Sequence, residues 1–148
     1  MSWLPKNKVV VPIDFSDHSF AALTTARQLV DSAEHLYLVH VLPRLEPAEP
    51  GVLWTTIDDE SRRHHAELAL RERIADTDAA DAQIEIRFGD PGGEIADLAA
   101  QIGADLIVLP SHGRTGLARV LIGSVAERVA RLADCPVLVL KHVLPHSA

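Results

Sequence analysis

Four short aliphatic runs constrain the fold of this chain more than any other feature of its sequence. They span residues 9–13, 36–41, 106–109 and 137–140, and each is apolar at successive rather than alternate positions. This pattern is typical of strands buried on both faces, as in a parallel sheet. A fifth run, at residues 83–88, alternates polar and apolar residues. It predicts a strand with one solvated face, nearer an edge of the sheet.

Between these runs, apolar residues recur at the spacing of one helix face. The residues that follow this spacing are Ala22, Ala26, Leu29 and Ala33, then Ile95, Leu98, Ala99 and Ile102, and finally Val125, Val129 and Leu132. The segment from about 57 to 74 is strongly charged and predicts a helix with a wide solvated face, its apolar positions being Leu68, Leu70 and Ile74.

Capping residues agree with these helices. Ser16 or Asp17 can cap the first helix, and Asp90 followed by Pro91 suits the start of another. Gly103 follows Ile102, where a left-handed residue often ends a helix.

Strands that alternate with helices predict an α/β fold. Parallel strands need crossover connections, so helices should cover both faces of a parallel sheet. The segment 43–54 reads as a long irregular connection. A chain of 148 residues suits one domain, which we expect to span 1–148 with an ordered core of about 6–142.

Charge and cysteine content disfavour several classes of function. Lys and Arg total 14 against 21 Asp and Glu, a net charge of −7, whereas nucleic acids and anionic membranes attract concentrated positive charge. No apolar run approaches the roughly 20 residues that span a bilayer, and residues 1–8 lack the core of a signal peptide. The single cysteine, Cys135, indicates no disulfide. We therefore expect a cytoplasmic protein with neither nucleic-acid nor membrane partners.

Candidate site residues gather where three strands end, because ligands of open α/β sheets bind beyond the carboxyl ends of the strands. The segments concerned are 12–16, 40–43 and 110–116, the last leading to a helix that opens at Gly123 and Ser124. Asp14 follows the first strand directly. Its carboxylate is either an acceptor for ribose hydroxyls or an adenine amino group, or a turn-former or helix cap.

The glycine-rich connection after the fourth strand is the second candidate feature. Gly113 and Gly116 supply flexible backbone, and the helix opening at Gly123 and Ser124 offers free N–H groups to an anion. Arg114 either reaches outer phosphates or is merely solvated.

Other chemistries find less support. Neither a GxxxxGKS/T loop nor a GxGxxG motif is present. His64 and His65 are adjacent, so they diverge by about 100° on a helix and cannot form a zinc pair; no protein-ligated metal is expected. A triad of Ser111, His112 and Asp14 is disfavoured, because sequence neighbours rarely hold the required geometry. We expect Cys135 to be packed and inert.

These residues resemble the universal stress protein family over essentially the whole chain. The resemblance rests on VPIDFS at the first strand, Gly89-Asp90-Pro91, Ser111-His112-Gly113-Arg114-Thr115-Gly116 and the run from Gly123 to Ala126. ATP-binding members carry Gly, two residues, Gly, nine residues, then Gly-Ser or Gly-Thr. Gly113 and Gly123-Ser124 match, but Pro110 stands at the first glycine, where a contact through a backbone N–H is lost.

The resemblance implies a three-layer Rossmann-like fold of the adenine nucleotide alpha hydrolase type, with a five-stranded parallel sheet of order 3-2-1-4-5. It also implies ATP or AMP binding. Asp14 would contact ribose or adenine, Val41 would line the adenine pocket, and Gly113, Gly123, Ser124 and Val125 would hold phosphates. The full predicted set is Pro12, Ile13, Asp14, Ser16, Val41, Pro110, Ser111, His112, Gly113, Arg114, Gly116, Gly123, Ser124 and Val125.

Any Mg or Mn would ride on the phosphates, and a homodimer would form through the apolar edge strand Val137–Leu140. The preferred hypothesis is a dimeric, ATP- or AMP-binding stress-response module without efficient catalysis, so no catalytic residue is assigned. Two alternatives stay open. One is a slow Mg- or Mn-dependent ATP hydrolase using Asp14 or His112, and the other is a nucleotide-free dimer acting through protein contacts.

Overall fold

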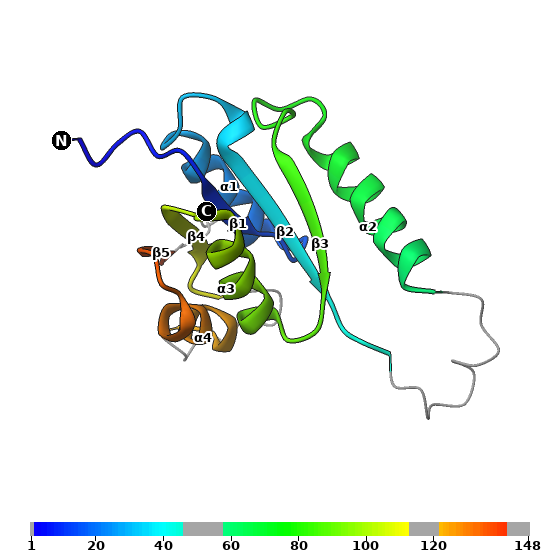
Figure 1. Ribbon diagram of the computed structural model, residues 1–148. Helices are drawn as coiled ribbons and strands as arrows, with labels where there is room; N and C mark the ends of the chain where they lie inside the picture. The colour runs from blue at the N-terminus through cyan, green and yellow to red at the C-terminus, as the bar shows by residue number, and fades with distance from the viewer. Residues whose placement is uncertain (1, 46–57, 113–121, 142–148) are drawn as a thin grey trace, which may run out of the picture.

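The computed structural model describes residues 2–45, 58–112 and 122–141, in which strands and helices alternate (Figure 1). The elements in chain order are β1 (Val9–Pro12), α1 (Asp17–Arg27), the 3-10 turn η1 (Ala33–His35), β2 (Leu36–Leu42), α2 (Asp59–Ile74), β3 (Gln83–Phe88), α3 (Pro91–Ile102), β4 (Leu106–Pro110), α4 (Ser124–Leu132) and β5 (Val137–Leu140). All five predicted strands form, with ends within one residue of those expected.

The strands make one parallel sheet of order β3-β2-β1-β4-β5, which confirms the predicted topology. Val9 pairs with both Leu36 and Leu106, so β1 lies between β2 and β4. Because every strand runs the same way, the carboxyl ends of β1, β2 and β4 lie along one edge of the sheet.

Helices cover both faces of the sheet, as expected (Figure 1). On one face α1 and α2 pack on alternate strand residues. Among these are four residues that are fully buried, Val9, Val11, Leu38 and Val108. On the other face α3 and α4 pack on the intervening residues, such as Val10 and Ile107. Burial on both faces explains why these runs are continuously apolar rather than alternating.

The expected edge position of the alternating strand is also confirmed, because β3 lies at one end of the sheet. Gln83 is exposed whereas Ile86 and Phe88 are buried.

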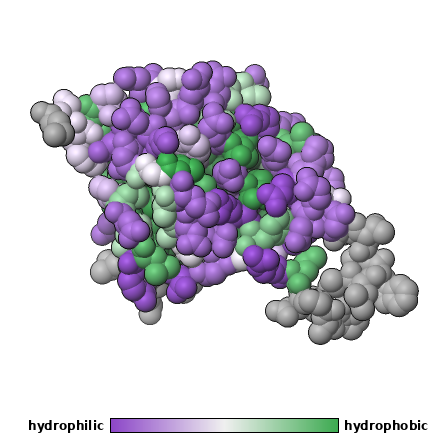
Figure 2. All heavy atoms as spheres, viewed as in Figure 1, coloured by the Kyte–Doolittle hydropathy of each residue, from purple (hydrophilic) through white to green (hydrophobic). Residues whose placement is uncertain are grey.

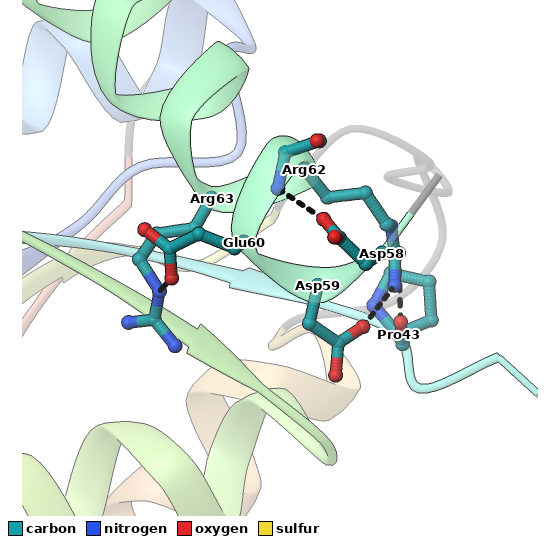
Figure 3. A network of polar contacts seen from close by, with 7 residues as sticks. Pro43, Asp58, Asp59, Glu60, Arg62 and Arg63 are labelled. Carbon is teal, nitrogen blue, oxygen red and sulfur yellow. Dashed lines mark hydrogen bonds and ion pairs between the residues drawn. The ribbon is translucent and has the colours of Figure 1, made fainter. Parts of the chain in front are cut away.

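Helix α2 is joined to the chain that leaves β2 (Figure 3). The Arg62 guanidinium donates to the Pro43 carbonyl at 2.8 Å and lies 3.5 Å from the Asp59 carboxylate. The exit of β2 is therefore tied to the first turns of α2.

The predicted caps form. The Ser16 side chain accepts from the Ser19 N–H at the start of α1, so Ser16 rather than Asp17 is the cap. Asp90 accepts from the Gly93 N–H with Pro91 in the first turn of α3. Gly103 ends that helix at φ 67°, a left-handed conformation in which glycine is favoured.

Three helical expectations are wrong in detail. Helix α1 ends at Arg27, so Leu29 and Ala33 lie beyond it. The Leu29 carbonyl accepts from the N–H of Lys6 instead of continuing the helix. Leu68 is 53% exposed, since α2 buries Leu70 and Ile74 on a narrow stripe. In α4 the buried residues are Ala126 and Val129, whereas two residues expected on the apolar face are exposed, Val125 and Leu132.

One face of the molecule is mostly polar (Figure 2). Figure 2 shows a face on which hydrophilic residues predominate, with apolar residues in smaller patches between them. Within the described ranges, no helix combines the length and the apolar character that crossing a bilayer requires.

Candidate functional site

The candidate site begins at the carboxyl edge of the sheet, where hydrogen bonds join the strand ends. The Ile13 N–H donates to the Val39 carbonyl at 2.8 Å, which extends the pairing of β1 with β2 beyond Pro12. The Ser111 N–H donates to the Leu140 carbonyl at 2.8 Å and extends β4 along β5 in the same way. The predicted residues Ile13 and Ser111 are buried, and Pro12 and Pro110 are half-buried. The ends of the central strands are thus fixed.

Asp14 begins a tight turn between β1 and α1. Its Oδ1 accepts from the Ser16 N–H at 2.9 Å and from the Ser16 hydroxyl. Phe15, between them, has φ 65°, a conformation that non-glycine residues seldom adopt and that clusters at functional sites. Of the two roles open for Asp14, the turn-forming one is therefore observed. The carboxylate is also half-buried and held in one orientation.

Val41 lies near the end of β2 and is half-buried. It packs against the cluster beneath α3 and α4, on the same face of the sheet as Val10. Asp14 follows the end of β1, the strand that pairs with β2. Strand order therefore brings Val41 and Asp14 to the same edge of the sheet.

The end of β4 meets the start of α4 directly. The Gly123 N–H donates to the Ser111 carbonyl, and a Cβ on Gly123 would lie 2.9 Å from that oxygen. Any side chain at this position would collide with backbone, so the close approach requires glycine. This contact brings together two predicted site residues that are distant in sequence.

Helix α4 starts without a side-chain cap, because Gly123 occupies the N-cap position. The first helix-closing bond runs from the Glu127 N–H to the Gly123 carbonyl, so the N–H groups of residues 124–126 precede it. Ser124 and Val125 are exposed at this end. Such an end attracts anions through about half a positive charge of aligned dipoles. Glu127 opposes this attraction, but its carboxylate is paired with Arg131 at 2.7 Å.

His112 follows Ser111 and is half-buried. Its Nδ1 is a buried atom without a hydrogen-bond partner among the residues described. Three predicted contacts, Gly113, Arg114 and Gly116, lie outside the described residues.

An ion pair fixes α4 against α3 beside the site. Arg128 Nε lies 2.6 Å from Asp90 Oδ2. The Gly93 N–H and the Arg128 guanidinium hold the pKa of Asp90 below its ordinary value of 3.8. A Cβ on Gly92 would lie 2.7 Å from the Arg128 side chain, so this glycine lets the arginine cross the start of α3. The direction of α4 is therefore set by contacts with α3 as well as by its bond to Ser111.

Cys135 lies between α4 and β5 and is half-buried. Burial raises the pKa of its thiol above the ordinary value of 9.0. This environment agrees with the expected unreactive thiol. In ranges 2–45, 58–112 and 122–141, no three His, Cys, Asp or Glu side chains are grouped so that they could hold a metal ion.

Two residues beside Asp14 carry no role in the predicted site, Phe15 and His40. The backbone conformation of Phe15 has no local sequence signal, because left-handed residues are usually Gly, Asn or Asp. A polar residue within an otherwise aliphatic strand is the signal for His40, whose ring contacts the turn at Ile13 and Phe15.

Comparisons with known proteins identify one family. The model of the universal stress protein family matches residues 6–141. The chain is 38% identical over 141 residues to universal stress protein MJ0531 of Methanocaldococcus jannaschii, covering 90% of this chain and 81% of that one. It is 31% identical over 147 residues to universal stress protein YxiE of Bacillus subtilis, covering 91% and 99%.

Solved structures agree. UspA from Lactobacillus plantarum superposes with a TM-score of 0.71 at 34% identity, covering 91% of this chain and 97% of that chain. A universal stress protein in complex with cAMP has a TM-score of 0.66 at 24% identity, covering 94% and 99%, which shows a shared fold.

Proposed function

This chain belongs to the universal stress protein family, and from that premise we propose that it is a regulatory protein that binds an adenine nucleotide, ATP or AMP, at the carboxyl edge of its sheet. The observation that carries the proposal is the junction of Ser111 with Gly123. It sets the uncapped start of α4 against the end of β4, beside the strand from which Asp14 emerges.

Each part of an adenylate has a suitable group in this arrangement. The phosphates would accept from the Ser124 hydroxyl and from the N–H groups of residues 124–126, which donate to no carbonyl within the part of the chain that the structure describes. Asp14 would accept from ribose hydroxyls or the adenine amino group, and Val41 would contact the base. The chain carries a net charge of −7, so attraction for phosphate would come from these local amides.

The comparisons support this proposal at the level of the family and the fold. A universal stress protein of the same fold has been solved in complex with cAMP, an adenine nucleotide. Pro110 has no backbone N–H, and the N–H groups of Ser111 and Gly123 already donate to carbonyls. The N–H groups that begin α4 and the Ser124 hydroxyl would therefore be the phosphate contacts near the sheet.

Thermal unfolding with ATP, ADP, AMP and GTP tests the proposal. An adenylate at 100 times its Kd should stabilise the protein by about 2.7 kcal/mol. Asp14→Ala should abolish most of that shift. Asp17→Ala removes a nearby carboxylate, in the first turn of α1, and should leave the shift intact. Absence of any shift with millimolar ATP, ADP or AMP would contradict the proposal and favour a nucleotide-free dimer.

We propose further that two copies pair through β5, because the two edges of the sheet differ in protection. At the β3 edge, Arg63 Nη1 donates to the Ile86 carbonyl at 3.0 Å, so a side chain occupies an outer backbone group. The hydrogen bonds of β5 within the described residues run to β4. An aliphatic edge strand with free outer groups is a site for strand addition.

A second candidate function is slow ATP hydrolysis, which His112 favours because its buried Nδ1 lacks a partner among the described residues. The side chains described do not form a metal site, so Mg or Mn would depend on the phosphates for binding. Phosphate release measured with each metal tests this function. It should fall with His112→Ala and Asp14→Ala but not with Asp17→Ala, and equal release by all four proteins would reject it.

A further inference from the structure

His40 contacts the chain on both sides of Asp14. Its Nδ1 lies 2.7 Å from the carbonyl oxygen of Ile13, and its ring lies edge-on to the Phe15 ring with centroids 4.9 Å apart. We propose that His40 is a positioning residue, which orients Asp14 for nucleotide binding without touching the nucleotide. This inference rests on the proposed adenine-nucleotide function.

The hydrogen bond from His40 defines which nitrogen carries the proton. A carbonyl oxygen can only accept, so Nδ1 must be the donor. A neutral His40 is therefore the Nδ1–H tautomer, with its other nitrogen unprotonated. β1 ends at Pro12, and the Ile13 N–H makes the last backbone bond to β2, at Val39. The Ile13 carbonyl accepts from the His40 side chain at the point where the chain leaves the sheet.

The contact with Phe15 acts on the other side of Asp14. Phe15 has φ 65°, which is unfavourable for a bulky residue and persists only where the surroundings hold it. Its ring is held edge-on between His40 and Phe20, the second pair having centroids 6.1 Å apart. Removing the imidazole would thus release the carbonyl before Asp14 and loosen the ring after it.

His40 also precedes Val41 on β2. Alternation along the strand directs these two side chains to opposite faces, which agrees with Val41 packing on the α3 and α4 side. One residue therefore couples the strand that would contact adenine to the turn that carries Asp14.

A second histidine supplies a matched control. His35 Nδ1 lies 2.9 Å from the carbonyl oxygen of Asn7, just before β1 begins. His35 lies just before β2 and His40 lies within it. The two side chains bond the backbone beyond opposite ends of β1, but only His40 is at the carboxyl edge. Loss of either bond should affect folding stability, whereas loss of the His40 bond alone should affect nucleotide binding.

The test compares His40→Leu, His40→Asn and His35→Leu by calorimetric titration with ATP and AMP, together with thermal unfolding of each variant. His40→Leu should weaken binding about tenfold, the equivalent of one hydrogen bond. His40→Asn should recover most of the loss, because its amide can donate near the Nδ1 position. His35→Leu should bind as the wild type does, whatever its change in Tm.

Nitrogen NMR of the wild-type protein supplies a readout independent of affinity, and His40 should show the Nδ1–H tautomer. An Nε2–H tautomer, unchanged binding by His40→Leu, or equal weakening by His35→Leu would overturn the positioning role while wild-type binding stands. Failure of the wild type to bind ATP or AMP would instead reject the proposed function and this role with it.

Discussion

Gly123 donates its backbone N–H to the carbonyl of Ser111, which joins the start of α4 to the end of β4. Gly123 lies too close to this strand end to carry a side chain. A Cβ on Gly123 would lie 2.9 Å from the Ser111 carbonyl oxygen and 3.6 Å from the His112 Cα. This contact sets the distance between the anion-attracting end of the helix and the edge of the sheet.

Replacing Gly123 by alanine should therefore move α4 away from β4. We expect Gly123→Ala to cost about 1–3 kcal/mol of unfolding free energy, as overpacking commonly does, and to weaken ATP binding. Denaturant unfolding and calorimetric titration measure the two effects. Ser124→Ala is the control for the unfolding measurement alone, because Ser124 is exposed and its loss leaves the backbone contact intact; its ATP binding should fall, since the proposed hydroxyl contact to phosphate is lost. A Gly123→Ala protein as stable as the wild type would show that the close contact does not hold.

Asp90 should stabilise the protein in a pH-dependent way. Its pKa in the folded state is lowered by the Gly93 N–H and by Arg128, so its contribution is present above its ordinary value of 3.8 and is lost as the pH falls through the folded value. Asp90→Ala should cost about 1 kcal/mol at pH 7 through loss of the helix cap.

Asp90→Asn separates the cap from the charge, because asparagine also caps helices. It should lose only the exposed ion pair with Arg128, about 0.2–1 kcal/mol at pH 7. The difference from the wild type should shrink as the pH falls below 3.8, which urea unfolding at pH 7 and pH 3 measures. A difference that grows in acid would contradict this assignment.

The proposed dimer depends on backbone groups of β5 that face outward. Pro136 and Leu140 carbonyls accept from β4, so alternation turns the N–H of Val139 away from the sheet. Val139→Pro should remove an outward donor and yield a monomer, without removing a bond to β4.

Sedimentation equilibrium measures the oligomeric state of this variant. Val139→Thr, which keeps the N–H and the branched side chain, should remain a dimer. A dimeric Val139→Pro protein would place the interface elsewhere.

The Cys135 thiol should react slowly with disulfide reagents. Burial raises its pKa, so at pH 7 to 8 less of it is thiolate than of an ordinary thiol. Its reaction rate should rise at a higher pH than the rate of N-acetylcysteine does. After unfolding in guanidinium, the two reaction rates should become similar. Faster reaction of the folded protein would contradict the raised pKa of this half-buried thiol.

Much of this architecture follows from local sequence. Strand runs buried on both faces, helix caps such as Asp90 and the left-handed end at Gly103 depend on residues close in the chain, so their patterns predict them well. Burial at helix ends is less local. Val129 is fully buried whereas Leu132, the last residue of α4, is 44% exposed, although both residues follow the same apolar spacing.

The candidate site divides in the same way. From sequence alone, Asp14, Val41, Ser111 and Gly123 can be assigned to strand ends and a helix start, because each follows or precedes a recognisable periodic run. Their contacts could not be assigned: the Gly123 bond to Ser111 and the His40 bond to Ile13 join segments separated in the chain. Only the order of the strands and the crossing of the helices bring such groups within hydrogen-bonding distance. A local sequence pattern cannot predict this, because it involves residues of one segment alone.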